Sequence, residues 1–231
     1  MTLACSTCPV RDRAACSALG EQERDELARA GRTRVLARGE TLFTAGESER
    51  ACATLISGML KVTRIRADGS ERILALIHPA GFVGELFQPF AKHDIVALGE
   101  SRLCVFAGSS FDAALDRYPA LARALLRRTQ EDLYASRELL ALSGSGSARS
   151  RVTGSLLAMA RAASQSPCHG TESFDLPLTR GDWADMLGLT IETVSRTLTA
   201  LEREGAIKRG GSRGIELVDP ARLSELGEVE V

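Results

Sequence analysis

The stretch "LTRGDWADMLGLTIETVSRTLTALEREGAIKRGGSRGIEL", residues 178–217, decides the fold of the C-terminal part of the chain. Thr179 can cap a helix over residues 180–187, with Asp182 in the first turn, where the helix dipole favours negative charge. Gly188 opens a short turn, and Thr190 can cap a second helix that runs to about Glu204. The segment therefore predicts a helix-turn-helix.

The second helix of this pair has one apolar and one polar face. We expect its inward face to consist of Ile191, Val194, Leu198 and Leu201, and its outward face of Glu192, Ser195, Arg196 and Thr199. Arg can bond guanine O6 and N7 together, Glu can accept from cytosine N4, and Ser suits several partners. We predict that this face reads DNA in the major groove, together with the hydroxyls of Thr179, Thr190 and Thr193.

The helix is followed by "IKRGGSRGIEL", which predicts two short strands around glycines. Lys208, Arg209 and Arg213 would make this hairpin a wing that contacts phosphates. A small helical domain with a solvated polar face is the plain alternative. The caps, the glycine turn, the inward apolar pattern and the basic wing occur together, so we assign residues 148–231 to a winged helix-turn-helix DNA-binding domain.

The N-terminal part of the chain has a different pattern of apolar and turn-forming residues. Glu21 to Ala30 predicts a short surface helix, and short apolar runs broken by glycines from Thr33 to Ala107 predict a small β-sandwich or barrel. "RIRADGSERI" is a hairpin candidate, because Asp68-Gly69 is a dipeptide that type I′ turns favour. We assign residues 21–110 to a β-barrel sensor domain.

A long helix is expected from Pro119 to Leu142, within a dimerisation segment of residues 111–142. One seam has coiled-coil spacing and consists of Leu126, Thr129, Leu133, Ser136 and Leu140, and a second stripe consists of Leu121, Leu125 and Leu139. We expect one face on the barrel and one on a second copy, with the two polar residues weakening the pairing. A core helix inside a monomer is the alternative. "SGSGS" (residues 143–147) has linker composition.

The composition of the 231 residues sets limits on function: 29 Lys and Arg balance 30 Asp and Glu, so bulk charge does not decide for or against nucleic acid. No apolar run reaches the roughly 18 residues of a membrane helix, and the N-terminus lacks a signal peptide. We expect a cytoplasmic protein with no membrane partner. No Ser-His-Asp, P-loop or dinucleotide motif is present, so we expect no enzyme.

Three thiols, Cys5, Cys8 and Cys16, lie close together in "CSTCPVRDRAAC". A reducing compartment disfavours stable disulfides. The CxxC pair and the third thiol can serve zinc or a 4Fe–4S cluster, each of which needs four ligands. The fourth must then be Cys52, Cys104 or Cys168. Zinc, an iron–sulfur cluster and a thiol redox switch remain open at this point.

A barrel, a long helix and a winged helix-turn-helix, in this order, resemble the Crp/Fnr family of bacterial transcription factors. "GETLFTAGE", "LISGMLKV", "GFVGELF" and "LTRGDWADMLGLTIETVSRTL" carry the resemblance, which spans nearly the whole chain. It implies an α+β fold: a double-stranded β-helix (jelly-roll) barrel of the cyclic-nucleotide-binding type, a dimerisation helix and the winged domain. It also implies a homodimeric activator that contacts RNA polymerase, with the loop from Leu86 to Asp94 as a contact.

The recognition helix resembles the FNR branch of the family, with Glu192, Ser195 and Arg196 at the places of its Glu-x-x-Ser-Arg motif. This resemblance implies operators like TTGAT-N4-ATCAA, in which Glu192 and Arg196 read the G·C pair and Ser195 a thymine. FNR-type oxygen sensors hold a 4Fe–4S cluster with three N-terminal cysteines and one in the barrel, just before the long helix. Cys104 matches that place, so the resemblance implies the ligands Cys5, Cys8, Cys16 and Cys104, with residues 1–20 as the cluster-binding segment.

The seven residues between Cys8 and Cys16 resemble the FnrN/FnrL-like subgroup of these sensors. The resemblance implies that an intact cluster pins the N-terminal segment to the barrel and favours dimerisation, and that oxygen or nitric oxide reverses this. Alternatives are zinc, thiol redox chemistry, haem, for which the histidines are His78, His93 and His169, or no cofactor. "GELFQPFAKHDIVAL" lacks the Arg-Ser pair of cyclic-nucleotide-binding relatives, so we expect no cyclic nucleotide.

Overall fold

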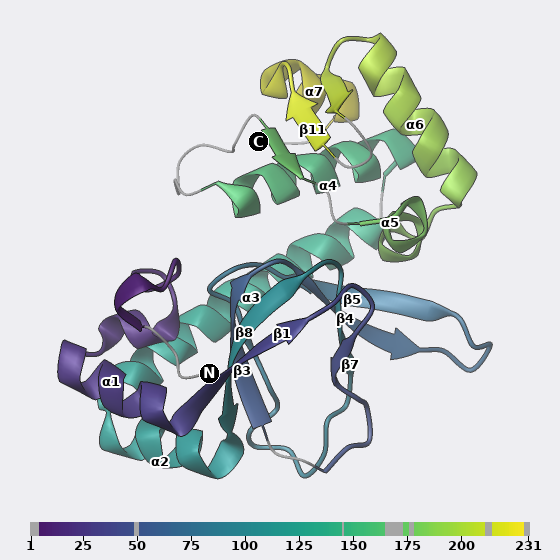
Figure 1. The fold of residues 1–231 in the computed structure, drawn as a ribbon. Helices are drawn as coiled ribbons and strands as arrows, with labels where there is room; N and C mark the ends of the chain where they lie inside the picture. Colours follow the sequence, from purple (N-terminus) through teal and green to yellow (C-terminus); the bar gives the residue numbers. More distant parts are fainter. Residues whose placement is uncertain are drawn as a thin grey trace. The chain divides into compact units, whose positions relative to one another are not determined.

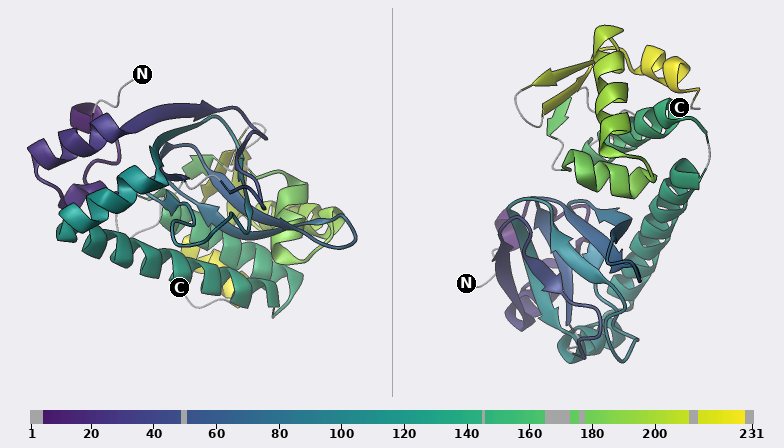
Figure 2. Two further views of the ribbon diagram at one scale, coloured as in Figure 1. Left: turned by 90° about the horizontal axis from the view of Figure 1, so that it is seen from below. Right: turned by 90° about the vertical axis from the view of Figure 1, so that its right-hand side faces the viewer.

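The computed structural model describes residues 5–48, 51–144, 146–164, 173–175, 178–210 and 214–228. The chain forms two compact units. The first contains the residues up to Ser136 except Glu71–Ile73, and the second contains Glu71–Ile73 and the residues from Arg137 onward. Figure 1 and Figure 2 show the elements of each unit.

Two four-stranded antiparallel sheets face each other in the first unit, which is the expected jelly-roll. One sheet has the order β1-β8-β3-β6 and the other β2-β7-β4-β5. The strands are β1 (Gly31–Leu36), β2 (Thr41–Phe43), β3 (Ala51–Ser57), β4 (Leu60–Ile65), β5 (Glu71–Ile77), β6 (Phe82–Val83), β7 (Asp94–Ala97) and β8 (Ser101–Ala107). Between the sheets lies a core that includes Leu36, Leu55, Leu60, Leu103 and Val105.

Strand alternation divides the side chains of β3 and β8 between two cores. Leu103 and Val105 point into the barrel, whereas Cys104 and Phe106 point outward. The outward face is covered by the 3-10 turn η2 (Ala15–Ala18) and by the helices α1 (Glu21–Ala30), α2 (Gly108–Arg117) and the start of α3 (Pro119–Gly144). A further 3-10 turn, η1 (Cys5–Thr7), precedes η2 in the chain. Leu121 and Leu125 of the predicted second stripe of α3 are buried here, whereas Leu139, its third member, is only half-buried and is not part of this core.

The hairpin of β4 and β5 forms around Asp68 and Gly69, but its turn is not of type I′. That turn needs positive φ at both central residues, and within the described chain Gly69 has a φ of 81° while Asp68 is not among the positive-φ residues. The Asp68 carboxylate instead accepts bonds from the Ser70 amide (2.9 Å) and hydroxyl (2.6 Å). This bonding holds a longer turn with only Gly69 in the left-handed region.

Gly58, between β3 and β4, is required by close packing. Its φ is 92°, and an added Cβ would lie 2.4 Å from the Ser101 hydroxyl and 2.5 Å from the Glu100 carbonyl. We expect Gly58→Ala to lower the free energy of unfolding by at least about 2 kcal/mol through backbone strain and overpacking. Urea unfolding measures this. Gly39→Ala is the control, because Gly39 has a φ of 80° but open space around it; equal losses in both variants would contradict the packing argument.

The second unit contains α4 (Ala148–Ala163), β9 (Ser173–Asp175), α5 (Arg180–Leu187), α6 (Ile191–Arg203), β10 (Ile207–Gly210), β11 (Gly214–Leu217) and α7 (Pro220–Gly227). The helix-turn-helix and the two wing strands are as predicted, and β9 adds a third strand in the order β10-β11-β9. The linker is shorter than its composition indicates, because Ser143 and Gly144 extend α3 and Ser147 caps α4.

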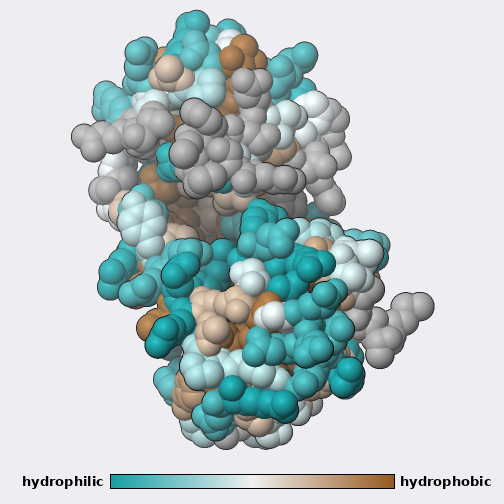
Figure 3. All heavy atoms as spheres, turned by 90° about the vertical axis from the view of Figure 1, so that its left-hand side faces the viewer, coloured by the Kyte–Doolittle hydropathy of each residue, from teal (hydrophilic) through white to brown (hydrophobic). Residues whose placement is uncertain are grey.

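No helix in the described ranges is long and apolar enough to cross a membrane. The face drawn in Figure 3 is largely hydrophilic, with small apolar patches.

Candidate functional site

The second helix of the helix-turn-helix, α6, is fixed by its N-terminal cap and its apolar face. The Thr190 hydroxyl accepts from the Thr193 amide at 3.1 Å, and Val194, Leu198 and Leu201 are fully buried. Ile191 was expected to face inward, but that prediction is wrong: its side chain is 57% exposed. As the first residue of the helix, Ile191 lies beyond the end of the apolar stripe that the three buried residues form.

The opposite face of α6 is open to solvent. The side chains of Glu192 and Arg196 are 79% and 72% exposed, with Arg196 Nε 3.9 Å from Glu192 Oε1. Thr199 is exposed and Ser195 half-buried, whereas Thr193 lends its amide and hydroxyl to the cap. Because an exposed pair at this distance is weak, both charged groups can turn to base edges.

The first helix of the motif, α5, supports α6 through its own cap and a buried tryptophan. Thr179 and Asp182 form a capping box, and Gly188 ends the helix in the left-handed conformation with a φ of 64°. Trp183 is fully buried and donates from Nε1 to the Ser155 hydroxyl of α4 at 2.9 Å. This bond ties the motif to α4.

Two arginines in the first turns of α4 hold the ends of both motif helices. Arg149 pairs with Glu204, the C-cap of α6, at 2.6 Å. Arg151 donates to the Leu187 carbonyl at the end of α5 at 3.2 Å. Sequence reasoning missed these residues, because each partner lies more than 30 positions away and no local pattern connects them.

The wing places its basic residues differently. Lys208 is 70% exposed and lies 3.7 Å from Glu216 on the neighbouring strand. Arg209 is bonded to Glu202 of α6 and is only 32% exposed. Arg213 lies outside the described residues.

The four expected ligand cysteines lie near one another in the first unit. Cys8, Cys16 and Cys104 pack against a small buried cluster of Val10, Ala14, Ile56 and Ala80. Cys5 is near enough for its charge to act on the pKa of both Cys16 and Cys104. All four are free thiols with partial exposure. Cys168 and His169 lie outside the described residues.

The seven residues between Cys8 and Cys16 form a loop that packs on the barrel through its own apolar side chains. Val10 and Ala14 are 2% and 1% exposed, and the Ala14 amide bonds the Val10 carbonyl at 2.9 Å in a helical turn. Arg24 of α1 then donates to the carbonyls of Cys16 (3.3 Å) and Leu19 (2.7 Å). The longer loop therefore anchors the N-terminal segment by its own apolar side chains.

The thiols fit a cationic centre by their chemistry. Burial, and then the charges of Cys8 and Cys5, raise the pKa of Cys16 to about 11. Burial also raises the pKa of Cys104 well above its usual range, with the other cysteines adding to the effect. A bound metal reverses such shifts because it stabilises thiolates. Among the described residues, however, no three His, Cys, Asp or Glu side chains are close enough to enclose a single metal ion.

Cys52 lies on the same outward face of the sheet as Cys104. It belongs to the neighbouring strand β3, where it pairs with Phe106, two residues after Cys104 on β8, and alternate residues of a strand point to the same face. It is fully buried, and burial raises its pKa to about 12. Cys52 is therefore a buried small side chain on this face.

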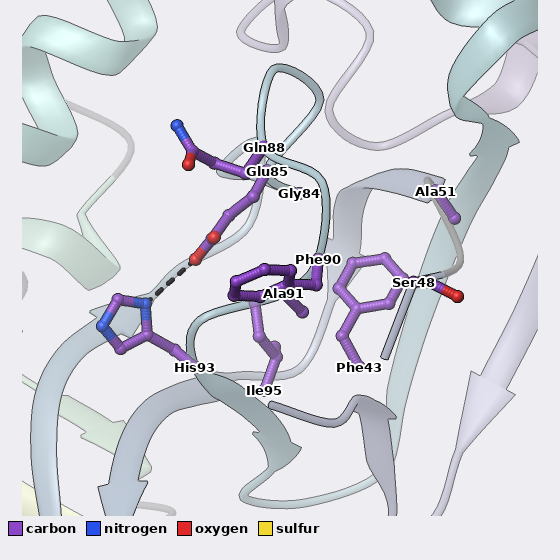
Figure 4. Close-up of a pocket in the computed structure, with 10 residues that line it drawn as sticks. All are labelled: Phe43, Ser48, Ala51, Gly84, Glu85, Gln88, Phe90, Ala91, His93 and Ile95. Carbon is purple, nitrogen blue, oxygen red and sulfur yellow. Dashed lines mark hydrogen bonds and ion pairs between the residues drawn. The ribbon is translucent and has the colours of Figure 1, made fainter. Parts of the chain in front are cut away.

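A pocket in the barrel lies between β2, β7 and the loop after β6 (Figure 4). Glu85 and His93 face each other across its edge, with His93 Nδ1 3.0 Å from Glu85 Oε1. Glu85 also accepts from the Lys92 amide at 3.1 Å. The described lining contains neither Arg nor Lys. His78 lies elsewhere, and burial together with Arg128 lowers its pKa to about 4.

The outer face of α3 exposes the leucines of the predicted seam: Leu126 is 64%, Leu133 49% and Leu140 68% exposed. The hydroxyls of the polar seam residues form hydrogen bonds within their own helix. The Thr129 hydroxyl donates to the Leu125 carbonyl and the Ser136 hydroxyl to the Asp132 carbonyl, both at 2.9 Å. Burying these hydroxyls against a second helix would therefore leave no unpaired donor.

In the homodimer predicted from this seam, we expect Leu133→Glu to shift the protein to a monomer, because each of the two copies would lose about 1.5–3 kcal/mol of leucine burial at the interface. The dissociation constant should rise at least roughly hundredfold, which sedimentation equilibrium measures. Val35→Glu is the control, since Val35 is 52% exposed on β1. An unchanged dissociation constant in Leu133→Glu would show that this seam is not the dimer interface.

Comparison with known proteins covers both units. The profile of the Crp-like helix-turn-helix domain matches residues 150–226, and that of the cyclic nucleotide-binding domain matches residues 33–118. The transcriptional activator protein FnrL of Cereibacter sphaeroides is 34% identical over 224 residues, which cover 96% of this chain and 90% of that protein. The nitrogen fixation regulation protein FixK of Bradyrhizobium diazoefficiens is also 34% identical over 224 residues, covering 96% and 93%.

Among solved structures, FixK2 from Bradyrhizobium japonicum is similar with a TM-score of 0.76 and 26% identity, covering 85% of this chain and 96% of that one. These relatives are named as regulators of transcription or nitrogen fixation, not as enzymes.

Proposed function

The chain belongs to the Crp/Fnr family of transcriptional regulators, and from that premise we propose that it is a homodimer that controls its genes in response to oxygen, nitric oxide or redox state through a 4Fe–4S cluster. That it is a DNA-binding activator of the Crp/Fnr type, and not an enzyme, follows from the family itself. The signal and the cofactor are the proposed part. The observation that carries them is the gathering of four thiols where the N-terminal segment covers β8.

Cys5, Cys8, Cys16 and Cys104 would hold the cluster. When bound, it supplies an oxygen-sensitive link between the N-terminal segment and the barrel. Val10 and Ala14 dock the segment on the barrel by apolar burial. Arg24 holds the end of the loop to α1. Cys16 and Cys104 belong to the same buried cluster as α2 and the first turns of α3, so a change in this segment bears on the dimerisation helix.

For DNA recognition, we propose that Glu192, Ser195 and Arg196 read a TTGAT-N4-ATCAA-like operator, with Thr179, Thr190, Thr193, Thr199, Arg209 and Arg213 at its backbone or neighbouring bases. The exposure of the charged pair supports this. Leu126, Thr129, Leu133, Ser136 and Leu140 would pair two copies so that both recognition helices reach successive major grooves.

Two further partner assignments are part of the proposal. The loop from Leu86 to Asp94 would contact RNA polymerase, and Phe87 and Phe90 on it are 74% and 50% exposed. Cyclic nucleotides would not bind, because the pocket offers the Glu85 carboxylate and no Arg or Lys among its described lining. A phosphate there would lack the cation that its desolvation requires.

Anaerobic purification, iron and sulfide assays and a visible spectrum test the proposal, together with operator binding before and after exposure to air. We expect a coloured, iron-containing protein whose operator affinity falls in air. A colourless, iron-free protein that binds the operator equally with and without oxygen would refute it and favour a regulator of the same family without a cofactor. Bound zinc without colour would favour the zinc alternative.

A further inference from the structure

The last turn of α6 is bonded to the wing through one carboxylate. Glu202 accepts from the Arg209 amide at 3.1 Å and from Arg209 Nε at 2.8 Å, and also bonds Arg209 Nη2. These bonds hold the pKa of Glu202 below its usual range. Charge-assisted bonds of this two-pronged kind fix orientation as well as distance. The Arg209 guanidinium is therefore fixed in place before any ligand arrives.

Glu202 occupies one edge of that guanidinium, which has five N–H donors in all. The side chain of Arg209 is 32% exposed, so donors on its other edge can meet an acceptor from solvent. The pairing with Glu202 thus orients Arg209 and leaves other N–H donors of its guanidinium available to a second acceptor.

We propose that Glu202 is a positioning residue that holds Arg209 so that the outer edge of its guanidinium binds one phosphate of the operator backbone. This inference rests on the DNA binding described above and adds a positioning residue to it. It links the last turn of α6 and the wing in a single phosphate contact. It also gives Glu202, an acidic group in a DNA-binding domain, a favourable effect on binding.

The test is the salt dependence of DNA binding. Fluorescence anisotropy measures the affinity for a TTGAT-N4-ATCAA duplex and for an unrelated duplex at several salt concentrations. We expect Arg209→Met to weaken binding to both duplexes. It should reduce the slope of log K against log salt by about 0.9 per half-site, or roughly two for the homodimer. An unchanged slope in Arg209→Met would overturn the phosphate assignment.

Glu202→Gln separates positioning from bulk charge. If Glu202 were only a negative charge near DNA, its removal would tighten binding; as a positioning residue, its removal should weaken binding and shift the salt slope toward that of Arg209→Met. In an Arg209→Met background, Glu202→Gln should no longer weaken binding, because the residue that it positions is absent.

Glu216→Gln is the matched control, because it removes a negative charge from the same wing next to Lys208 and should tighten binding. Circular dichroism melting confirms that each variant is folded. Tighter binding by folded Glu202→Gln, as in the control, would overturn the positioning role. If the wild-type protein shows no preference for the operator, the operator assignment fails instead, and the unrelated duplex still tests the Arg209 phosphate contact through the salt slope.

Discussion

Arg196→Met should abolish sequence-specific DNA binding while leaving the protein folded. Its side chain is 72% exposed on the outer face of α6, so its removal creates no cavity and breaks no buried bond. A bidentate Arg–guanine contact contributes about 1–3 kcal/mol of discrimination. Loss in both half-sites of a dimer then costs about 2–6 kcal/mol, or roughly thirty- to ten-thousandfold in affinity.

The measurement is a titration of the TTGAT-N4-ATCAA duplex and of a scrambled duplex. The two affinities should become nearly equal in Arg196→Met. Arg203→Met is the matched control, since Arg203 is exposed at the end of the same helix and should affect both duplexes alike. Retained preference for the operator in Arg196→Met would show that this arginine does not read the sequence. An accompanying loss of bound iron would contradict the independence of the two units.

Cys104→Ser should prevent the protein from holding an iron–sulfur cluster. Cubane clusters of this kind need four thiolates, and Cys104 is the barrel thiol that faces the three N-terminal cysteines. We expect about four irons and four sulfides per chain in the anaerobic wild-type protein. The variant should lose this content and the visible absorbance. Both readouts are independent of DNA binding.

Cys52→Ala is the matched control. Cys52 lies on the same face of the same sheet but is fully buried among apolar side chains. Its replacement should cost some stability and leave the iron content unchanged. If Cys104→Ser kept its full iron and sulfide while Cys52→Ala lost them, the barrel ligand would be Cys52.

Much of the local structure could be predicted from short-range patterns. The caps at Thr179 and Thr190, the glycine turn at Gly188 and the helix α1 are formed as expected, because each depends on residues within one or two turns of the chain. The errors also lie at local boundaries. Ile191 is exposed and the Asp68-Gly69 turn is of a different type, since a helix end and a turn have several conformations of similar energy.

The sequence by itself determined the order of barrel, long helix and helix-turn-helix, and the outward polar face of α6, because these follow from periodicity and capping. Only the tertiary structure decided which distant charges meet. Glu202 with Arg209, Arg149 with Glu204, and the packing of Cys104 against the N-terminal loop depend on how strands and helices stack. The physical reason is that hydrogen bonds within a helix or turn are encoded by neighbours along the chain. Contacts between elements are fixed by the burial of apolar faces, which brings together side chains that no sequence spacing relates.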